Sequence, residues 1–254
     1  MFASSMLAIF LASSATATAV LRNHGLAQVV SSCIVPNTVA LTFDDGPWKY
    51  LYNISKTLIA ADAKGTFFFN GNNWDCIYNE DARKRVKYAY DKGHQVASHT
   101  WSHAHLPKLT WDQLHNEFWR VEQALIRIAG TYPAFARPPY GEYNDMVREV
   151  AQMRGQTLVN WDFDSGDSIG KSAQDSMRTY NRLVQEHPDT ILALNHEVYE
   201  ETAHVVLPHA IKIFQDAGYK LVTVAECLGM PAYQNVSEPE IDDVIVFATE
   251  LFNA

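Results

Sequence analysis

Residues 62–70, DAKGTFFFN, contain the pattern that decides the fold. A segment of helical character ends just before Gly65, and a short aromatic run of strand character follows at once. Glycine just past a helix typically takes the left-handed conformation that ends it, and short runs rich in aromatic or β-branched residues are typical of strands. The stretch is therefore predicted to be the end of a helix and a buried strand.

The same order of segments recurs along the chain at four further glycines, Gly93, Gly130, Gly155 and Gly218. Strands are predicted near 39–43, 65–70, 94–98, 134–137, 157–161, 190–194 and 219–224, and helices near 53–62, 80–92, 111–129, 144–154, 172–187 and 204–217. Repeated βα units favour a parallel sheet. We predict an α/β fold, a distorted (β/α)7–8 barrel in a single domain. The alternative is an open doubly wound sheet, but no GxGxxG motif follows the first strand.

The segment 111–129 shows the clearest helical periodicity, with apolar residues at helical spacing. Thr110 and Gln113 form a capping-box pattern at its start. We therefore expect a long amphipathic helix that begins directly after Thr110.

The balance of charges limits the class of partner. The formal net charge is −9, so the chain lacks the basic footprint of a nucleic-acid-binding protein. A negative protein suits a neutral substrate whose product is cationic. We expect no nucleic-acid partner, and we expect a monomer.

The two ends of the chain differ from its middle. Residues 1–19 combine a short apolar core with the small residues Ala17 and Ala19, as a secretory signal and its cleavage site do. The apolar run is too short to span a membrane. The predicted organisation is a signal peptide at 1–19, an N-terminal segment at 20–34, a main domain at 35–230 and an acidic C-terminal tail at 231–254.

Two further features agree with secretion. Asn53 and Asn235 each begin an Asn-x-Ser glycosylation sequon. The C-terminal residues carry no lipid-anchor signal. We expect a secreted protein, extracellular or in the cell wall, without a membrane anchor.

The sequence contains three cysteines, Cys33, Cys76 and Cys227. In an oxidising compartment one pair is expected, with one cysteine left over. Cys33 precedes the first predicted strand and Cys227 follows the last one. A disulfide between them would join the two ends of the domain and leave Cys76 free.

Polar residues with catalytic chemistry stand at the ends of five predicted strands. The groups are Asp44 and Asp45, His99 and His103, Arg137, Asp164 and Asp167, and His196. In α/β barrels the active site is built at the carboxyl ends of the strands. These residues therefore predict an active site at that rim.

His99 and His103 lie four positions apart, a spacing that puts both imidazoles on one face of a helical turn. With one carboxylate they form a ligand set typical of Zn²⁺ or another divalent ion with open positions. Adjacent strand residues point in opposite directions, so Asp44 and Asp45 can have separate roles. One is expected to bind the ion and the other to accept a proton.

Five short motifs in this order resemble those of the polysaccharide deacetylases, carbohydrate esterase family 4. They are TFDDGP at 42–47, HTWSH at 99–103, RPPYG at 137–141, DSGD at 164–167 and LNH at 194–196. The resemblance spans roughly residues 35–228 and is greatest to the secreted fungal chitin deacetylases. It implies that the domain at 35–230 is catalytic.

The resemblance also implies a role for each matched residue. Asp45, His99 and His103 would hold one divalent metal ion, most simply Zn²⁺, with Co²⁺ or another divalent ion as the alternative. Asp44 would be the catalytic base, Arg137 would hold that base, and His196 would be the catalytic acid. Asp164 would orient and charge His196, the backbone of Tyr140 would bind the oxyanion, and Leu194 would form a wall of the acetyl pocket.

One position departs from the family pattern. The fourth motif usually carries a tryptophan after its second aspartate, Asp167, and this sequence has Ser168 there. That tryptophan normally helps to close the acetyl pocket. Trp161 is a candidate to compensate, and the acyl specificity is open.

Substrate-binding residues are expected among the aromatic side chains near the first two strands. Trp48 and Tyr50 follow the first motif, and Trp74 lies in the NGNNW loop after the second strand. Their faces can stack on sugar rings, although packing is an equally good account of each. Asp167 is a further substrate-binding candidate.

The sequence thus favours metal-dependent hydrolysis of N-acetyl groups from N-acetylglucosamine polymers such as chitin or its oligomers. Two alternatives remain: a deacetylase of another glycan such as acetyl-xylan, and a catalytically silent chitin-binding protein. A pure binder has no need of both a base and an acid. A non-haem iron oxygenase shares the ligand set, but its usual all-β fold conflicts with the helix–glycine–strand repeats.

Overall fold

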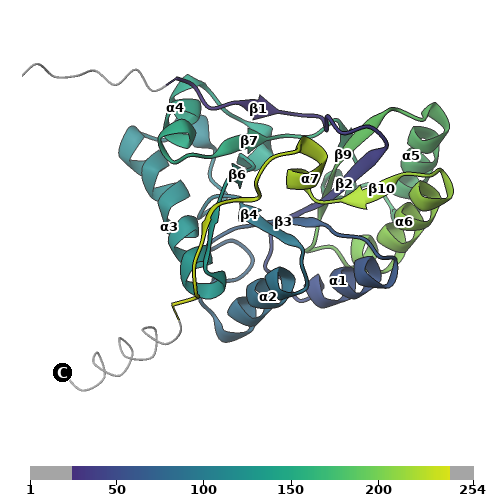
Figure 1. The fold of residues 1–254 in the computed structure, drawn as a ribbon, viewed down its shortest axis with the longest axis horizontal. Helices are drawn as coiled ribbons and strands as arrows, with labels where there is room; N and C mark the ends of the chain where they lie inside the picture. The colour runs from purple at the N-terminus through teal and green to yellow at the C-terminus, as the bar shows by residue number, and fades with distance from the viewer. Residues whose placement is uncertain (1–24, 241–254) are drawn as a thin grey trace, which may run out of the picture.

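A computed structural model describes residues 25–240, which form helices packed around a curled parallel sheet (Figure 1). Strand β2 (Thr38–Asp44) lies at its centre, between β9 (Thr190–His196) on one side and β3 (Thr66–Phe69) on the other. The nine-stranded sheet has the order β1-β7-β6-β4-β3-β2-β9-β8, with β10 pairing beside β2. Its other strands are β1 (Val29–Val30), β4 (Gln95–Ser98), β6 (Phe135–Ala136), β7 (Thr157–Val159), β8 (Phe163–Asp164) and β10 (Lys220–Val222).

Helices cover the outer face of this sheet, as the repeated βα pattern predicts (Figure 1). The long helix α3 begins directly after Thr110, and both hydrogen bonds of the predicted capping box are present. The helices are α1 (Leu51–Ala60), α2 (Glu80–Asp91), α3 (Trp111–Ala129), α4 (Asp145–Met153), α5 (Ala173–Glu186), α6 (Leu207–Asp216) and α7 (Val224–Leu228), with short turns η1 (Leu106–Lys108), η2 (Pro139–Gly141), η3 (Asp167–Ile169) and η4 (Thr202–Val206). The predicted distorted barrel is confirmed, and it is an open one because the strand order runs from β1 to β8.

The side chains of β2 alternate between the two faces of the sheet. Leu41 and Phe43 belong to the larger apolar cluster, which lies between the sheet and the helices α1 and α6. Ala40 belongs to a second cluster, with Phe68 of β3 and Leu192 of β9. Because strand side chains alternate, Thr42 and Asp44 share the face of Ala40. The polar end of β2 is therefore directed into the barrel rather than towards the helices.

The glycines that end the helices behave as predicted at four of five positions. Gly93, Gly130, Gly155 and Gly218 all have positive φ. Gly65 does not, and Asp62 takes the left-handed conformation instead, with φ 53°. Close packing explains why position 65 is a glycine, because a Cβ there would lie 2.9 Å from Cδ1 of Leu58.

The packed domain is longer than the predicted 35–230 at both ends. Val29–Val30 forms β1, which pairs with β7. Tyr233–Val236 forms β11, which pairs antiparallel with β5 (Thr131–Pro133). The first part of the predicted tail therefore belongs to the fold. The predicted signal peptide at 1–19 and the rest of the tail, 241–254, lie outside the described residues.

The predicted disulfide is present between Cys33 and Cys227, and Cys76 is free. The bond joins the segment between β1 and β2 to helix α7. This helix lies across one end of the barrel (Figure 1). Within residues 25–240 no helix is both long and apolar enough to cross a membrane.

Removal of this disulfide is expected to destabilise the domain. The bond joins residues 194 positions apart, and closing so long a loop restricts the unfolded chain. The double variant Cys33→Ser/Cys227→Ser should lose about 3–5 kcal/mol of unfolding free energy in the chain-entropy model. Urea denaturation measures this loss, and Cys76→Ser is the control. An equal loss in Cys76→Ser, or peptide mapping that finds Cys76 in the bridge, would contradict the account.

Candidate active site

A cavity of about 420 Å³ opens at the carboxyl ends of the strands. It brings together eight of the predicted site residues from motifs that lie far apart in the sequence. The lining residues are Asp44, Asp45, His99, His103, Pro138, Tyr140, Trp161, Asp164, Ser168, Ile169, Leu194, His196 and Tyr199.

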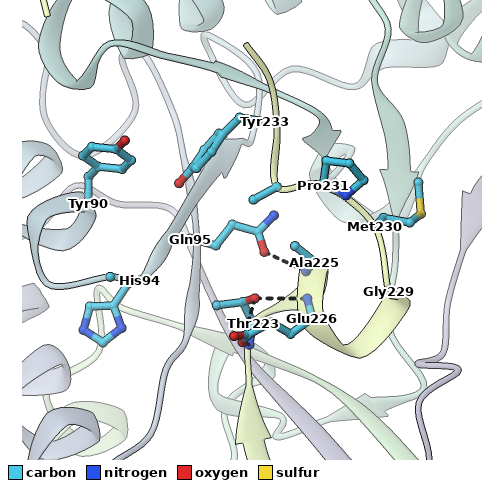
Figure 2. A pocket seen from close by; sticks show the side chains of 12 residues that line it. Tyr90, His94, Gln95, Thr223, Ala225, Glu226, Gly229, Met230, Pro231 and Tyr233 are labelled. Atoms are coloured by element: carbon cyan, nitrogen blue, oxygen red, sulfur yellow. Dashed lines mark hydrogen bonds between the residues drawn. The ribbon is translucent and has the colours of Figure 1, made fainter. Parts of the chain in front are cut away.

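A second cavity, of about 610 Å³, lies near the amino ends of β4 and α7 (Figure 2). Its polar groups serve the fold: Thr223 and Glu226 form a capping box, and the Gln95 side-chain carbonyl accepts a hydrogen bond from the Ala225 N–H. His94 is hydrogen-bonded to Ser55, and burial lowers its pKa to about 4. The smaller cavity is therefore the better candidate for chemistry.

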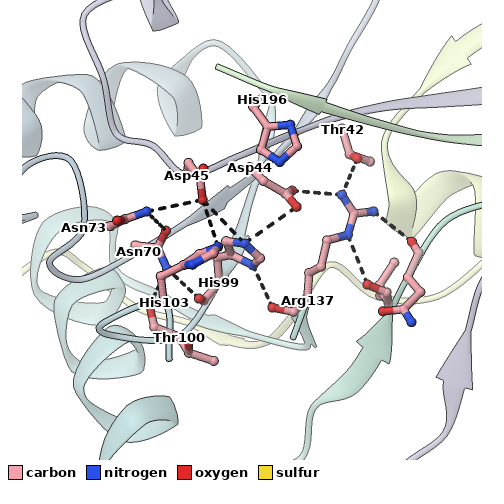
Figure 3. A network of polar contacts seen from close by, with 12 residues as sticks. Thr42, Asp44, Asp45, Asn70, Asn73, His99, Thr100, His103, Arg137 and His196 are labelled. Carbon is pink, nitrogen blue, oxygen red and sulfur yellow. Dashed lines mark hydrogen bonds and ion pairs between the residues drawn. The ribbon is translucent and has the colours of Figure 1, made fainter. Parts of the chain in front are cut away.

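Asp44, the last residue of β2, is held from inside the barrel by Arg137 (Figure 3). The fully buried guanidinium donates to Asp44 Oδ1 at 2.9 Å and to Thr42 Oγ1 at 2.5 Å. It also donates to the carbonyls of Val159 and Asn160 at the end of β7. These four bonds fix Arg137, so the position of the Asp44 carboxylate is fixed as well.

Burial raises the pKa of Asp44 above its ordinary value, and the charges of Arg137 and His196 act in the opposite direction. The net direction is upward, which brings this carboxylate nearer to the pKa that a general base needs at neutral pH.

Asp45, His99 and His103 form a group of possible metal ligands, with their ligating atoms within 4.8 Å of one another. Nδ1 of His99 lies 2.8 Å from the backbone oxygen of Arg137. A carbonyl can only accept, so Nδ1 carries the proton and Nε2 is directed towards Asp45 Oδ1 at 3.7 Å (Figure 3). Nε2 of His103 lies 3.3 Å from the same oxygen.

Burial lowers the pKa of His99 to about 3. The ring is therefore neutral, as a metal ligand must be.

The two histidines do not share a helical turn, so that part of the prediction is wrong. Residues 99–103 form an irregular loop, and Thr100 and His103 have φ of 64° and 55°. Asp45 and Tyr140 also have positive φ, at 73° and 60°. Such conformations cost free energy in residues with a Cβ and cluster at functional sites.

His196, the last residue of β9, is paired with Asp167 and not with the predicted Asp164. Nδ1 of His196 lies 2.7 Å from Asp167 Oδ1, and its backbone N–H donates to Asp167 Oδ2 at 2.8 Å. Thr202 Oγ1 donates to the same Oδ2. Asp164 Oδ1 instead accepts from the Gly166 N–H at 2.7 Å.

The prediction that Asp164 orients His196 is therefore wrong. Asp167 is the nearly buried partner of the histidine, and Asp164 lines the cavity. Burial alone would lower the pKa of His196, but the hydrogen bond and charge of Asp167 outweigh it and raise the pKa to about 9. His196 thus carries a proton at neutral pH.

One side of the cavity is apolar. Leu194 and Trp161 line it as predicted candidates, beside Ser168 and the exposed Ile169. Tyr140 forms the rim, and its ring stacks on His105 at a centroid distance of 4.2 Å. These residues give a small apolar pocket next to the charged groups.

The three predicted sugar-stacking residues lie outside this cavity lining. Trp48 and Trp74 are neighbours, with ring centroids 5.6 Å apart, and Trp74 is 48% exposed. Tyr50 is directed elsewhere, because its hydroxyl donates to Glu200 and its ring packs edge-on against His204. Of the three predicted sugar-stacking residues, Trp48 and Trp74 therefore form a pair, and Tyr50 lies apart from them.

Several residues of the site were not predicted from the sequence. Thr42 could have been found, because it lies two positions before Asp44 and so shares its face. Asn73 donates to Asp45 Oδ1 at 3.3 Å and to the Asn70 side chain. Its amide is one of several in NGNNW, so the sequence did not single it out. No pattern indicated Tyr199 or Ile169.

The fold and this site define a class, the α/β barrels with a candidate metal centre at the carboxyl ends of the strands. The family model described as polysaccharide deacetylase matches residues 33–159. The chain belongs to the polysaccharide deacetylase family.

Curated relatives and a solved structure agree with this membership. A chitin deacetylase from Pestalotiopsis sp is 34% identical over 88% of this chain and 76% of that protein. Another, from Colletotrichum lindemuthianum, is 30% identical over 79% of this chain and 83% of that protein. The solved structure of the chitin deacetylase from the fungal pathogen Colletotrichum lindemuthianum matches with a TM-score of 0.78 at 27% identity and covers 84% of this chain and 96% of that one.

Proposed function

We propose that this protein is a metal-dependent deacetylase that hydrolyses the N-acetyl groups of N-acetylglucosamine polymers, with chitin or its oligomers as substrate. One observation carries the proposal: a metal-ligand triad, a base held by arginine and a protonated histidine all border one cavity. Membership of the polysaccharide deacetylase family and the chitin deacetylases among its relatives support the substrate class.

Asp45, His99 and His103 would hold the ion. One carboxylate and two imidazoles suit Zn²⁺ with open positions, and Co²⁺ or another divalent ion is the alternative. When bound, such an ion lowers the pKa of a water molecule and polarises the substrate carbonyl. Asn73 and the carbonyl of Arg137 orient Asp45 and His99 for this role.

Asp44 would take a proton from the attacking water. Its raised pKa makes it a stronger base than an exposed aspartate, and Arg137 keeps its carboxylate directed at the cavity. The backbone N–H of Tyr140 would stabilise the oxyanion as the tetrahedral intermediate forms on the substrate. The positive φ of Tyr140 sets the orientation of that peptide group.

His196 would donate a proton to the departing amine. An amide nitrogen is a poor leaving group unless it is protonated, and Asp167 keeps His196 charged for this step. Leu194 and Trp161 would enclose the acetyl methyl group. Asp44 and His196 thus supply base and acid from neighbouring strands, since they are opposite residues in the β2–β9 pairing.

Two alternatives are separated by one assay. A silent chitin-binding protein gives no acetate with any substrate, and an acetyl-xylan esterase releases acetate from acetyl-xylan but not from chitin oligomers. The proposed activity predicts acetate release from chitin oligomers in excess of that from acetyl-xylan at equal acetyl concentration. Release from acetyl-xylan alone would overturn the choice of substrate.

We also propose that the protein is secreted, with residues 1–19 as its signal peptide. The Cys33–Cys227 disulfide supports an oxidising compartment. Asn53 and Asn235 are both exposed and are proposed as glycosylation sites. The mass of the peptide around each asparagine, measured before and after the expressed protein is treated with an N-glycosidase, tests the two sequons.

Loss of one metal ligand should remove both ion and activity. His103→Ala leaves only two of the three protein ligands that an open catalytic site uses, so both bound metal and acetate release are expected to fall to background. Elemental analysis of the purified variant measures the metal. Retention of one ion per chain would refute the ligand assignment. His105→Ala is the matched control, because His105 is hydrogen-bonded to Glu142 and does not belong to the triad.

Ser168 is expected to widen acyl specificity. Ser168 and Ile169 border the apolar side of the cavity, where a tryptophan would fill more space. N-propionyl glucosamine oligomers should therefore react within about 3-fold of N-acetyl ones, and Ser168→Trp should lower the propionyl rate by roughly 10-fold or more. The ratio of the two kcat/KM values measures this preference. If wild type already rejects propionyl substrates strongly, Trp161 closes the pocket and the inference is wrong.

A further inference from the structure

Glu197 is a buried acid that the proposed mechanism does not use. It directly follows His196 at the end of β9, and its side chain is 0% exposed. Its Oε1 accepts a hydrogen bond from the backbone N–H of Trp48, and its Oε2 has no partner among residues 25–240. Burying a carboxyl group with so few partners is costly, and an apolar residue would avoid the cost. A specific role at this position would explain why the acid is retained.

The Glu197 carboxyl group fills the turn that connects Asp45 to Trp48. A Cβ on Gly46 would lie 2.1 Å from Cδ of Glu197, so the carboxyl group packs directly on the backbone of this turn. The backbone N–H of Glu197 donates to the Asp44 carbonyl at 3.1 Å. Glu197 therefore contacts the chain on both sides of the metal ligand Asp45 without contributing to the cavity lining.

A backbone hydrogen bond joins this turn to the start of the loop that carries Trp74, because the Gly46 carbonyl accepts from the Asn70 N–H at 2.9 Å. The loop is also held to helix α2, where Arg85 lies 3.8 Å from Asp75, next to Trp74. Burial raises the pKa of Glu197 well above its ordinary value.

We propose that Glu197 is a positioning residue that fixes the backbone of Trp48 and so sets the Trp48–Trp74 pair as a sugar-binding surface beside the cavity. The inference rests on the proposed function, because it assigns the pair to the glycan that the site deacetylates. Glu197 acts on substrate affinity through Trp48. It does not touch the reacting atoms.

The test compares steady-state constants on a chitin oligomer. A displacement of about 1 Å in a positioning group can cost about 10²-fold. Glu197→Ala is expected to raise KM by roughly 10-fold with kcat within about 3-fold of wild type and with one metal ion retained. Glu197→Gln keeps an acceptor oxygen in the same volume and should restore most of the lost affinity. In a Trp48→Ala background, Glu197→Ala should have no further effect on KM.

A matched control separates positioning from general destabilisation. Glu122 of α3 is also 0% exposed and accepts a hydrogen bond from Arg154 at 2.6 Å, and neither residue lines the cavity. Glu122→Ala should lower the melting temperature without raising KM. If Glu197→Ala does not fold, Glu197→Asp is used, because its shorter side chain withdraws the acceptor from Trp48 and should also raise KM.

Three results would overturn the proposal: a fall in kcat with KM unchanged, loss of the metal ion, or additive effects of Glu197→Ala and Trp48→Ala. Calorimetric binding of the oligomer distinguishes this proposal from the proposed function, since binding does not require turnover. Absence of acetate release by wild type would contradict the deacetylase assignment. Unchanged oligomer affinity in both Glu197→Ala and Glu197→Asp would contradict the role of Glu197.

Discussion

Asp44→Asn is expected to abolish most of the turnover while the metal ion and the substrate still bind. Asparagine keeps the shape of the side chain and can still accept from Arg137, whose guanidinium lies 2.9 Å from Asp44 Oδ1. It cannot take a proton from water, so kcat should fall by about 10²–10⁴-fold, as is typical of a lost general base. Acetate release measures the rate, elemental analysis the metal, and calorimetry the oligomer affinity.

The neighbouring residue is the control for this prediction. Asp45 belongs to the metal-ligand group, so Asp45→Ala should lose metal and activity together. If Asp44→Asn loses the ion and Asp45→Ala keeps it, the two roles are reversed. If Asp44→Asn turns over at nearly the wild-type rate with the metal in place, the base lies elsewhere, and His196 would be examined first.

Asp167→Asn is expected to have the second largest effect. His196 must be protonated to act as an acid, and its raised pKa of about 9 means that activity is lost as the pH rises through that value. Removing the charge of Asp167 lowers the pKa of His196, so the alkaline limb of the rate profile should move to lower pH. At neutral pH the rate should fall by about 10²-fold.

Asp164→Asn tests which aspartate supports the histidine. Asp164 accepts from the Gly166 N–H and is not bonded to His196, so its neutralisation should leave the alkaline limb in place. The pH profile of kcat/KM for both variants decides the matter. If the alkaline limb moves in Asp164→Asn and stays in place in Asp167→Asn, then Asp164 charges His196, as the sequence resemblance implied.

The barrel could be predicted from sequence because each βα unit carries its own local signals. Helical periodicity over 111–129, its capping box and the glycines after four helices indicate elements that depend on short-range interactions. Strands β1 and β8 are two residues each, too short to show a period. Strand β11 is mostly exposed, so the alternation that marks a buried strand is absent from it.

The residues of the candidate site were largely predicted from sequence, and so was the Arg137–Asp44 pair, but the partner of His196 was not. Asp164 and Asp167 differ by three positions, and the path of the chain between them decides which one meets His196. Gly166 has a left-handed conformation and the turn η3 follows it. This directs Asp167 back to His196, and no sequence period encodes such a reversal.

The geometry of His99 and His103 was also not predictable from their spacing. A spacing of four residues indicated a helical turn, but positive φ at Thr100 and His103 brings the two rings together in a loop instead. Spacing alone gives proximity, and the backbone between the residues determines the geometry. The disulfide was predictable for the opposite reason, because only three cysteines were available and two flank the sheet.

The most direct test of the proposed activity is mass spectrometry of chitin oligomers after incubation with the metal-loaded protein. We expect products that are lighter by whole acetyl groups, with no cleavage of the chain, and no such products from Asp44→Asn under the same conditions. Oligomers that keep every acetyl group in the presence of the metal-loaded wild-type protein would contradict the central claim.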